Sequence, residues 1–128
     1  MRLLIAATAL MLSGCGQHLD TLPDAYQGEW DISAALCGDE DGVSRLTIGP
    51  QLLGYYDDFA KLAGPIQRDK DRVSARFDLG GANYLDGPPP PKGVQIDLTL
   101  GGYGNRLTVV LNGGSEEYVR CPRPVAQT

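Results

Sequence analysis

The sequence predicts an all-β protein: a small antiparallel up-and-down barrel of seven to eight strands, formed by residues 24–124. Three observations support this fold class. Apolar and polar residues alternate over several short segments, as they do in strands that bury one face. Clusters of glycine, proline and asparagine separate these segments at the spacing of hairpin turns. Helical periodicity is weak throughout, and a meander of this kind loses its exposed edges when it closes into a barrel.

The second half of the chain contains the clearest strand patterns. Glycine-rich turns such as residues 112–114 join these segments and favour hairpins. In the first of these segments Val73, Ala75, Phe77 and Leu79 are expected to point inward, and in the last segment Val119 and Cys121 are. The predicted strands of this half are residues 72–79, 94–100, 107–111 and 116–121.

The first half is less regular. Residues 26–32 alternate as a half-buried strand, with Trp30 and Ile32 on its inward side. Residues 44–50 form a further predicted strand that ends at a Gly-Pro pair. Residues 59–66 allow two interpretations, a short helix or a strand, because a second Gly-Pro pair would end a helix after one or two turns.

The N-terminus has the layout of a bacterial secretion signal. Arg2 supplies a positive charge, and residues 3–12 form an apolar run that is interrupted only by Thr8. A membrane-spanning helix needs about 20 apolar residues, so this run is too short to cross a bilayer. The run ends at Leu12-Ser13-Gly14-Cys15, which resembles the lipobox of bacterial lipoproteins.

The lipobox resemblance implies a domain organisation and a location. Residues 1–14 would be a signal peptide, and Cys15 would become the lipidated N-terminus. Acyl chains on Cys15 would then be the contact with the membrane, since two or more chains give stable attachment. Gly16 follows the cysteine where many lipoproteins of the inner membrane carry Asp, so the implied location is the outer membrane, facing the periplasm. The polar residues 15–23 would form a tether, and residues 125–128 are interpreted as a C-terminal tail.

The same resemblance also bears on the three cysteines of the chain. With Cys15 lipidated, Cys37 and Cys121 remain as a pair in an oxidising compartment, which favours one disulfide that closes the barrel domain. The alternative is a zinc or catalytic thiol site, which needs more ligands than the chain offers.

Charge and residue types narrow the classes of function. The chain has 11 Lys and Arg against 16 Asp and Glu, and this acidic balance argues against nucleic-acid binding. His18 is the only histidine and lies in the predicted tether, so no Ser-His-Asp arrangement is available. Asp57 and Asp58 are adjacent on a strand and would face opposite sides. We therefore expect no enzymatic activity, no metal site and no cofactor.

A short motif on the first strand resembles a feature of lipocalin-like barrels. Gly28-Glu29-Trp30 matches the Gly-x-Trp element of that family, in which the tryptophan plugs one end of the barrel. The resemblance implies a lipocalin-like barrel and a carrier of a small apolar ligand. Such a carrier would hold its ligand in a cavity lined by Trp30, Phe77, Ile96 and Leu98.

A long proline-rich loop, residues 80–93, is the predicted place for a ligand or protein partner, because long ordered loops commonly carry binding sites. A stiff crossover without a ligand is the other interpretation. Gly81-Ala82-Asn83-Tyr84 and Lys92-Gly93 resemble the loop motifs of membrane-bound inhibitors of c-type lysozyme, which implies inhibitory roles for Tyr84 and Lys92. The loop residues singled out as candidates are Tyr84, Pro88, Pro89, Pro90, Pro91 and Lys92.

Together these observations predict a lipid-anchored, non-catalytic binding module of the cell envelope. Its ligand would be a protein partner or a small apolar molecule. Two alternatives stay open: a periplasmic inhibitor of lysozyme, and a structural envelope lipoprotein without a dedicated ligand.

Overall fold

A computed structural model describes residues 17–122, which form ten β-strands and four short 3₁₀-helices, with no α-helix in that range. The strands are β1 (Gln17–Leu19), β2 (Gly28–Asp31), β3 (Leu46–Ile48), β4 (Leu52–Gly54), β5 (Asp58–Leu62), β6 (Ile66–Asp69), β7 (Arg72–Gly81), β8 (Val94–Gly101), β9 (Arg106–Leu111) and β10 (Gly114–Arg120). The 3₁₀-helices are η1 (Asp24–Tyr26), η2 (Ala34–Gly38), η3 (Ala82–Tyr84) and η4 (Gly102–Gly104).

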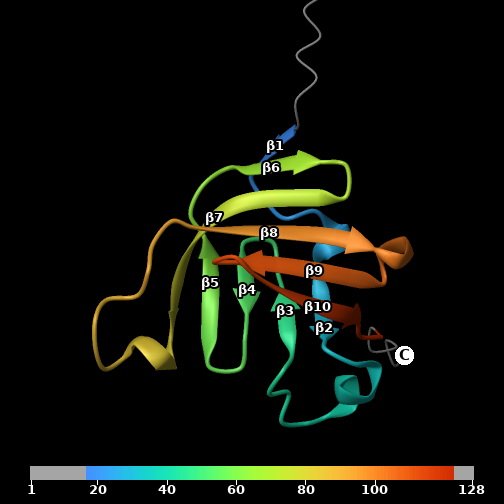
Figure 1. Ribbon diagram of the computed structural model, residues 1–128, viewed down its shortest axis with the longest axis horizontal. Coiled ribbons are helices and arrows are strands. Elements are labelled where there is room, and N and C mark those ends of the chain that lie inside the picture. The colour runs from blue at the N-terminus through green and yellow to red at the C-terminus, as the bar shows by residue number, and fades with distance from the viewer. Residues whose placement is uncertain (1–16, 123–128) are drawn as a thin grey trace, which may run out of the picture.

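Eight of these strands close into an antiparallel barrel (Figure 1). Neighbours in the barrel follow the chain from β2 to β5 and from β7 to β10, and the pairs β5–β7 and β10–β2 complete the circle. The predicted antiparallel up-and-down barrel of seven to eight strands is therefore confirmed. Closure leaves these eight strands without a long unpaired edge.

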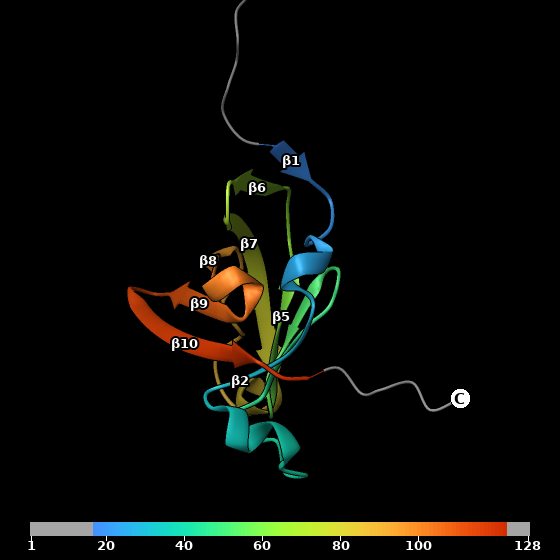
Figure 2. The same cartoon turned by 90° about the vertical axis from the view of Figure 1, so that its right-hand side faces the viewer.

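Strands β6 and β1 lie outside the closed circle and extend it at one end (Figure 2). This arrangement is possible because β7 is ten residues long and pairs with two different strands along the same edge. Arg72–Ser74 pair with β6, whereas Phe77–Gly81 pair with β5. Strand β1 then adds to the free edge of β6.

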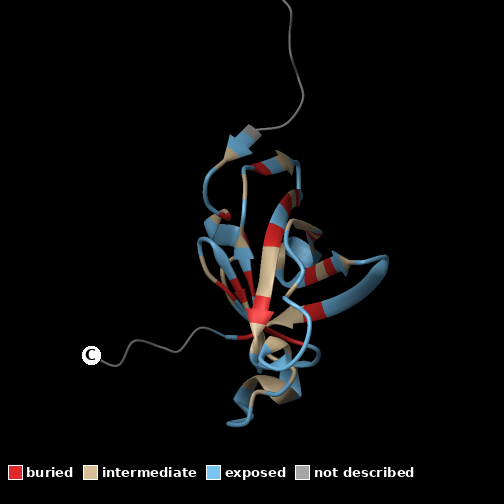
Figure 3. Cartoon of the chain, turned by 90° about the vertical axis from the view of Figure 1, so that its left-hand side faces the viewer, coloured by how far each residue is buried: buried red, intermediate tan, exposed pale blue. Residues whose placement is uncertain are grey.

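The core fills the inside of the barrel with alternate residues of the strands (Figure 3). Of the predicted inward positions of β7, Val73, Ala75 and Phe77 are buried, whereas Leu79 is half-buried and packs against the core. The largest fully buried side chains of the described range include Trp30, Tyr26, Phe77, Leu22, Leu46, Leu53, Ile66, Ile96, Leu98 and Leu107.

Two inward assignments from the sequence are wrong. Ile32 is 54% exposed, because β2 ends at Asp31 and the alternation stops there. In β10 it is Tyr118 that is buried, while Val119 is half-buried. Tyr118 lies opposite the buried Leu107 of β9, and residues directly opposite each other share a face of the sheet.

Arg120 shares the inner face with Tyr118 and closes one end of the barrel. Its guanidinium lies over the Trp30 ring, 4.1 Å from the ring centre. It also donates hydrogen bonds to the carbonyl oxygens of Gln27 at 3.0 Å and Gly104 at 3.1 Å, and to that of Ala25. A charged residue can occupy this inner position because its charge meets an aromatic face and backbone acceptors.

Residues 59–66, for which the sequence allowed a helix or a strand, are extended. They form most of β5 and a turn that leads into β6. Ala60 is fully buried, and Phe59 lies opposite Gly80 of β7. Pairing with β4 and β7 on its two sides explains why the segment is a strand rather than a helical turn.

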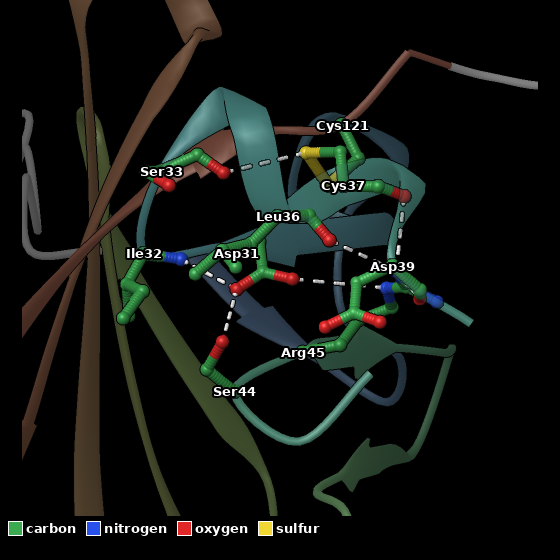
Figure 4. Close-up of a disulfide and its surroundings, with 9 residues drawn as sticks. All are labelled: Asp31, Ile32, Ser33, Leu36, Cys37, Asp39, Ser44, Arg45 and Cys121. Atoms are coloured by element: carbon green, nitrogen blue, oxygen red, sulfur yellow. Dashed lines mark hydrogen bonds and ion pairs between the residues drawn. A yellow bond between two sulfur atoms is a disulfide. The ribbon is translucent and has the colours of Figure 1, made fainter. Parts of the chain in front are cut away.

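The Cys37–Cys121 disulfide ties η2 to the end of β10 (Figure 4). The two Cα atoms are 5.4 Å apart, and the predicted pairing is confirmed. Beside it, the Arg45 guanidinium donates to the carbonyl oxygens of Leu36, Cys37 and Asp39. Its Nε lies 3.8 Å from a carboxylate oxygen of the fully buried Asp31, so the η2 segment is held to the barrel by a disulfide and a charge contact.

The predicted N-terminal tether is structured over residues 17–23. Residues 17–19 form β1, and Leu22 is buried with its N–H donating to the carbonyl of Pro50 at 2.7 Å. The predicted signal peptide, Cys15 and the predicted tail 125–128 lie outside the described residues. Within residues 17–122, no helix has the length and apolar character needed to cross a membrane.

Candidate ligand-binding site

A cavity of about 460 Å³ lies at the end of the barrel where the β4–β5 turn, the β7–β8 connection and the β9–β10 hairpin meet. This volume falls within the roughly 300–1,000 Å³ of pockets that hold small molecules. Three stretches of the barrel wall contribute to it. The lining residues are Tyr55, Asp58, Phe59, Leu79, Tyr84, Val109, Leu111, Gly114, Ser115 and Glu116.

Beside the cavity, the Phe59 ring packs over Gly80 on the outer face of the barrel, because the neighbouring Ala60 is the inward, buried residue of β5. A Cβ on Gly80 would stand 2.5 Å from the ring, so only glycine leaves room for this packing. The ring is 42% exposed, which is unusual for a phenylalanine that is so closely packed on one side. One face of Phe59 is therefore covered by β7, and Phe59 is among the residues that line the cavity.

Gly81 brings Tyr84 to the cavity. Its φ of 122° lies in a region that other residues avoid, and a Cβ there would collide with the carbonyl oxygen of Asp57. The next residue, Ala82, donates its N–H to that carbonyl at 2.8 Å. The chain thus turns sharply against the β4–β5 turn, and η3 places Tyr84 in the lining.

Two carboxylates border the cavity from different strands. Asp58, at the start of β5, accepts hydrogen bonds from the side-chain amide of Asn83 at 2.7 Å and from its backbone N–H at 3.4 Å. Glu116, on β10, accepts a hydrogen bond from the Tyr118 hydroxyl at 2.6 Å. Neither carboxylate is in an ion pair within residues 17–122, where the recorded pairs are Arg45–Asp31 and Arg72–Asp97.

Glu116 also affects two tyrosines in its neighbourhood. Burial and, to a lesser degree, the negative charge of Glu116 raise the pKa of Tyr55 to about 12. Burial and the hydrogen bond to Glu116 raise the pKa of Tyr118 as well. Both phenols therefore stay neutral and available as hydrogen-bond donors at physiological pH.

The raised pKa of Tyr55 leads to a prediction for alkaline pH. An unfolded tyrosine ionises near pH 10, so this phenol's contribution to stability is complete below pH 10 and is lost as the pH rises to about 12. The loss is at most about 2–3 kcal/mol. Urea unfolding at intervals across this range, compared with Tyr55→Phe, measures it; an equal decline in both proteins would contradict the prediction.

The opposite part of the barrel interior is packed. Trp30, Phe77, Ile96 and Leu98, the residues expected to line a carrier's cavity, are each at most 1% exposed, and none of them lines the cavity at the mouth. They fill the core instead, because a small eight-stranded barrel is just wide enough for its own side chains. These four residues therefore do not line the cavity at the mouth, and the carrier's lining was predicted at the wrong residues.

The proline-rich loop contributes to the cavity only at its start. Tyr84 lines the cavity, whereas Pro88–Pro91 and Lys92 do not. The end of the loop is fastened to β7: Leu79 donates its N–H to the carbonyl of Pro91, and Gly93 donates to the Asp78 carboxylate, both at 2.9 Å. Between these ends the loop stands away from the barrel (Figure 1), and Leu85 is 80% exposed.

Sequence reasoning did not single out Asp58 or Glu116 as binding residues. Asp58 was considered only as half of an acid pair with Asp57, and of the two only Asp58 lines the cavity. Glu116 stands two residues before the inward Tyr118, so correct alternation in β10 would have placed it on the inner face. In the part of the chain that the structure describes, no three His, Cys, Asp or Glu residues are grouped to hold a metal ion.

The fold and the cavity define a class: a closed eight-stranded up-and-down β-barrel with one disulfide and a ligand-sized cavity at its mouth. Comparison with protein-family models, with curated proteins and with solved structures found no match to this chain.

Proposed function

We propose that this protein is a lipid-anchored, non-catalytic binding module of the bacterial cell envelope, and that its ligand sits in the mouth cavity. The observation that carries the proposal is the cavity itself, whose walls are mostly aromatic and aliphatic with a few polar groups at defined positions. This composition is typical of sites that bind small molecules rather than of packed cores.

The residue types around the cavity support binding without catalysis. Among residues 17–122, Ser115 supplies the only aliphatic hydroxyl of the lining, and no histidine, lysine or cysteine of this range lines the cavity to activate it. His18, on β1, pairs with β6 outside the closed barrel. Asp58 and Glu116 are each engaged by a neutral hydrogen-bond donor.

The position of β1 supports an anchor that leaves the cavity accessible. Strand β1 begins two residues after Cys15 and reaches the barrel through β6, which pairs with the first residues of β7. The cavity is bordered by the other end of β7, where η3 begins. A ten-residue strand spans about 33 Å, so acyl chains on Cys15 would hold the barrel with its mouth directed away from the membrane.

The proposal is tested with a neutral fluorescent probe, N-phenyl-1-naphthylamine, on the processed chain carrying Cys15→Ser. We expect saturable binding of one probe per chain. Leu111→Trp should reduce the affinity at least about tenfold, because the larger side chain fills the cavity, whereas Val110→Trp on the outer face should not. Circular dichroism confirms that both variants are folded.

Two outcomes would contradict the proposal. Binding that is absent, or that is equal in the Leu111→Trp and Val110→Trp variants, would exclude the mouth cavity as the ligand site. The anchor is checked on the unmodified chain by mass spectrometry. Its N-terminal peptide should begin at Cys15 and carry the mass of the acyl groups, and an unmodified peptide that begins elsewhere would exclude the anchor.

A further inference from the structure

We infer that the mouth cavity selects ligands that carry a positive charge on an apolar body, such as an aryl-alkyl ammonium ion. This inference rests on the proposed function, because it assigns a chemical class to the ligand of the same cavity. It follows from the charges, the aromatic faces and the size of the lining.

The charged groups of the lining all have one sign. Asp58 and Glu116 are its carboxylic acids, and no lysine, arginine or histidine from the described part of the chain belongs to it. The two carboxylates come from different strands, β5 and β10, and both residues belong to the lining of the same cavity. Their negative charges make the cavity favourable for a cation and unfavourable for an anion.

The carboxylates are oriented by groups that do not neutralise them. Asn83 holds Asp58 through its amide, and Tyr118 holds Glu116 through its hydroxyl. Both donors are neutral, and the Tyr118 phenol stays neutral because its pKa is raised. The position of each carboxylate is therefore restrained by an uncharged donor, and a bound cation does not have to order it.

Aromatic rings add a second attraction for cations. Tyr55 and Tyr84 are the two tyrosines of the lining. The face of an aromatic ring attracts a cation, with ammonium groups that are shielded from water gaining the most. Leu79, Val109 and Leu111 supply the apolar surface that the rest of such a ligand would cover.

Neutral and anionic ligands gain less from the same cavity. A neutral ligand covers the apolar walls but must displace water from two carboxylates without replacing their interactions. An anion is repelled in addition by both charges. With a volume of about 460 Å³, the cavity accommodates one aromatic ring with a short alkyl chain and a charged group.

Three molecules of nearly equal shape test this inference by calorimetry on the processed chain with Cys15→Ser. They are 4-phenylbutylamine, which is protonated at neutral pH, the uncharged 4-phenylbutan-1-ol, and the anion 4-phenylbutyrate. We expect the amine to bind at least about tenfold more tightly than the alcohol, and the anion to bind most weakly. Added salt should reduce the advantage of the amine.

Variants in which the two carboxylates are replaced by neutral amides test whether these carboxylates cause the preference for the amine. Asp58→Asn combined with Glu116→Gln should abolish the difference between amine and alcohol while binding of the alcohol persists. Glu117→Gln, on the same strand but outside the lining, should leave the difference unchanged. An unchanged preference in the double variant would overturn the inference.

The outcomes separate this inference from the proposed function. Equal affinity for the amine and the alcohol in the unmodified cavity would overturn the charge preference and leave a binding cavity for neutral ligands. Failure of all three molecules and of N-phenyl-1-naphthylamine to bind would overturn both proposals.

Discussion

Removal of the disulfide by Cys37→Ser together with Cys121→Ser is expected to lower the free energy of unfolding by about 4–5 kcal/mol. The bond joins residues 84 positions apart, so the unfolded chain gains much conformational freedom when it is absent. A small domain has a total stability of about 5–15 kcal/mol, and the variant should therefore be only marginally folded. Urea unfolding of both proteins, followed by circular dichroism, measures the difference.

In the folded protein, the disulfide also holds the η2 segment against the barrel, and this local effect differs from its constraint on the unfolded chain. It joins η2 to the end of β10, next to the contact between Asp31 and Arg45. Arg45 binds three carbonyl oxygens of the η2 segment without the disulfide's help, so we expect this segment to stay on the barrel under folding conditions. A stability loss below about 1 kcal/mol would show that the long-range link does not constrain the unfolded chain.

Trp30→Ala is expected to cost about 3–5 kcal/mol, the usual cost of removing a large buried aromatic side chain. Trp30 is fully buried, its indole N–H donates to the carbonyl of Tyr26 at 3.0 Å, and Arg120 lies over its ring. The substitution leaves a cavity, an unpaired carbonyl and a guanidinium without its aromatic contact. The measurement is urea unfolding with detection by circular dichroism.

Trp30→Phe is the matched control. It keeps an aromatic ring beneath Arg120 but loses the hydrogen bond to Tyr26, so it should cost clearly less, about 1–2 kcal/mol. If Trp30→Ala and Trp30→Phe lowered the free energy of unfolding equally, an aromatic ring beneath Arg120 would not contribute to stability. Val110→Ala, on the exposed outer face of β9, should change the stability by less than about 0.5 kcal/mol.

Local sequence patterns predicted correctly which side chains point inward where a strand pairs on both sides and buries one face. The alternation in β7 placed Val73, Ala75 and Phe77 inward, and the structure agrees. The pattern failed where strands end or where a charged residue lies inward. Ile32 lies beyond the end of β2, and Arg120 occupies an inner position because Trp30 and three backbone carbonyls receive its charge.

The cavity could not have been located from these patterns. Its lining comes from the β4–β5 turn, the end of β7, η3, β9 and β10, which are distant in sequence. They meet because β5 pairs with β7 and β10 pairs with β2, and these long-range pairings carry no local signal. Tyr84 was singled out for its loop, yet the residues that oppose it across the cavity were not.

By itself, the sequence determined the all-β class, most of the strands, the meander and the pairing of Cys37 with Cys121, because alternation, turn residues and cysteine chemistry are local properties. Only the tertiary structure decided that the interior is packed around Trp30 and that the cavity lies at the opposite mouth. The reason is physical. The register of closure decides which side chains from distant strands meet, and no short segment contains that information.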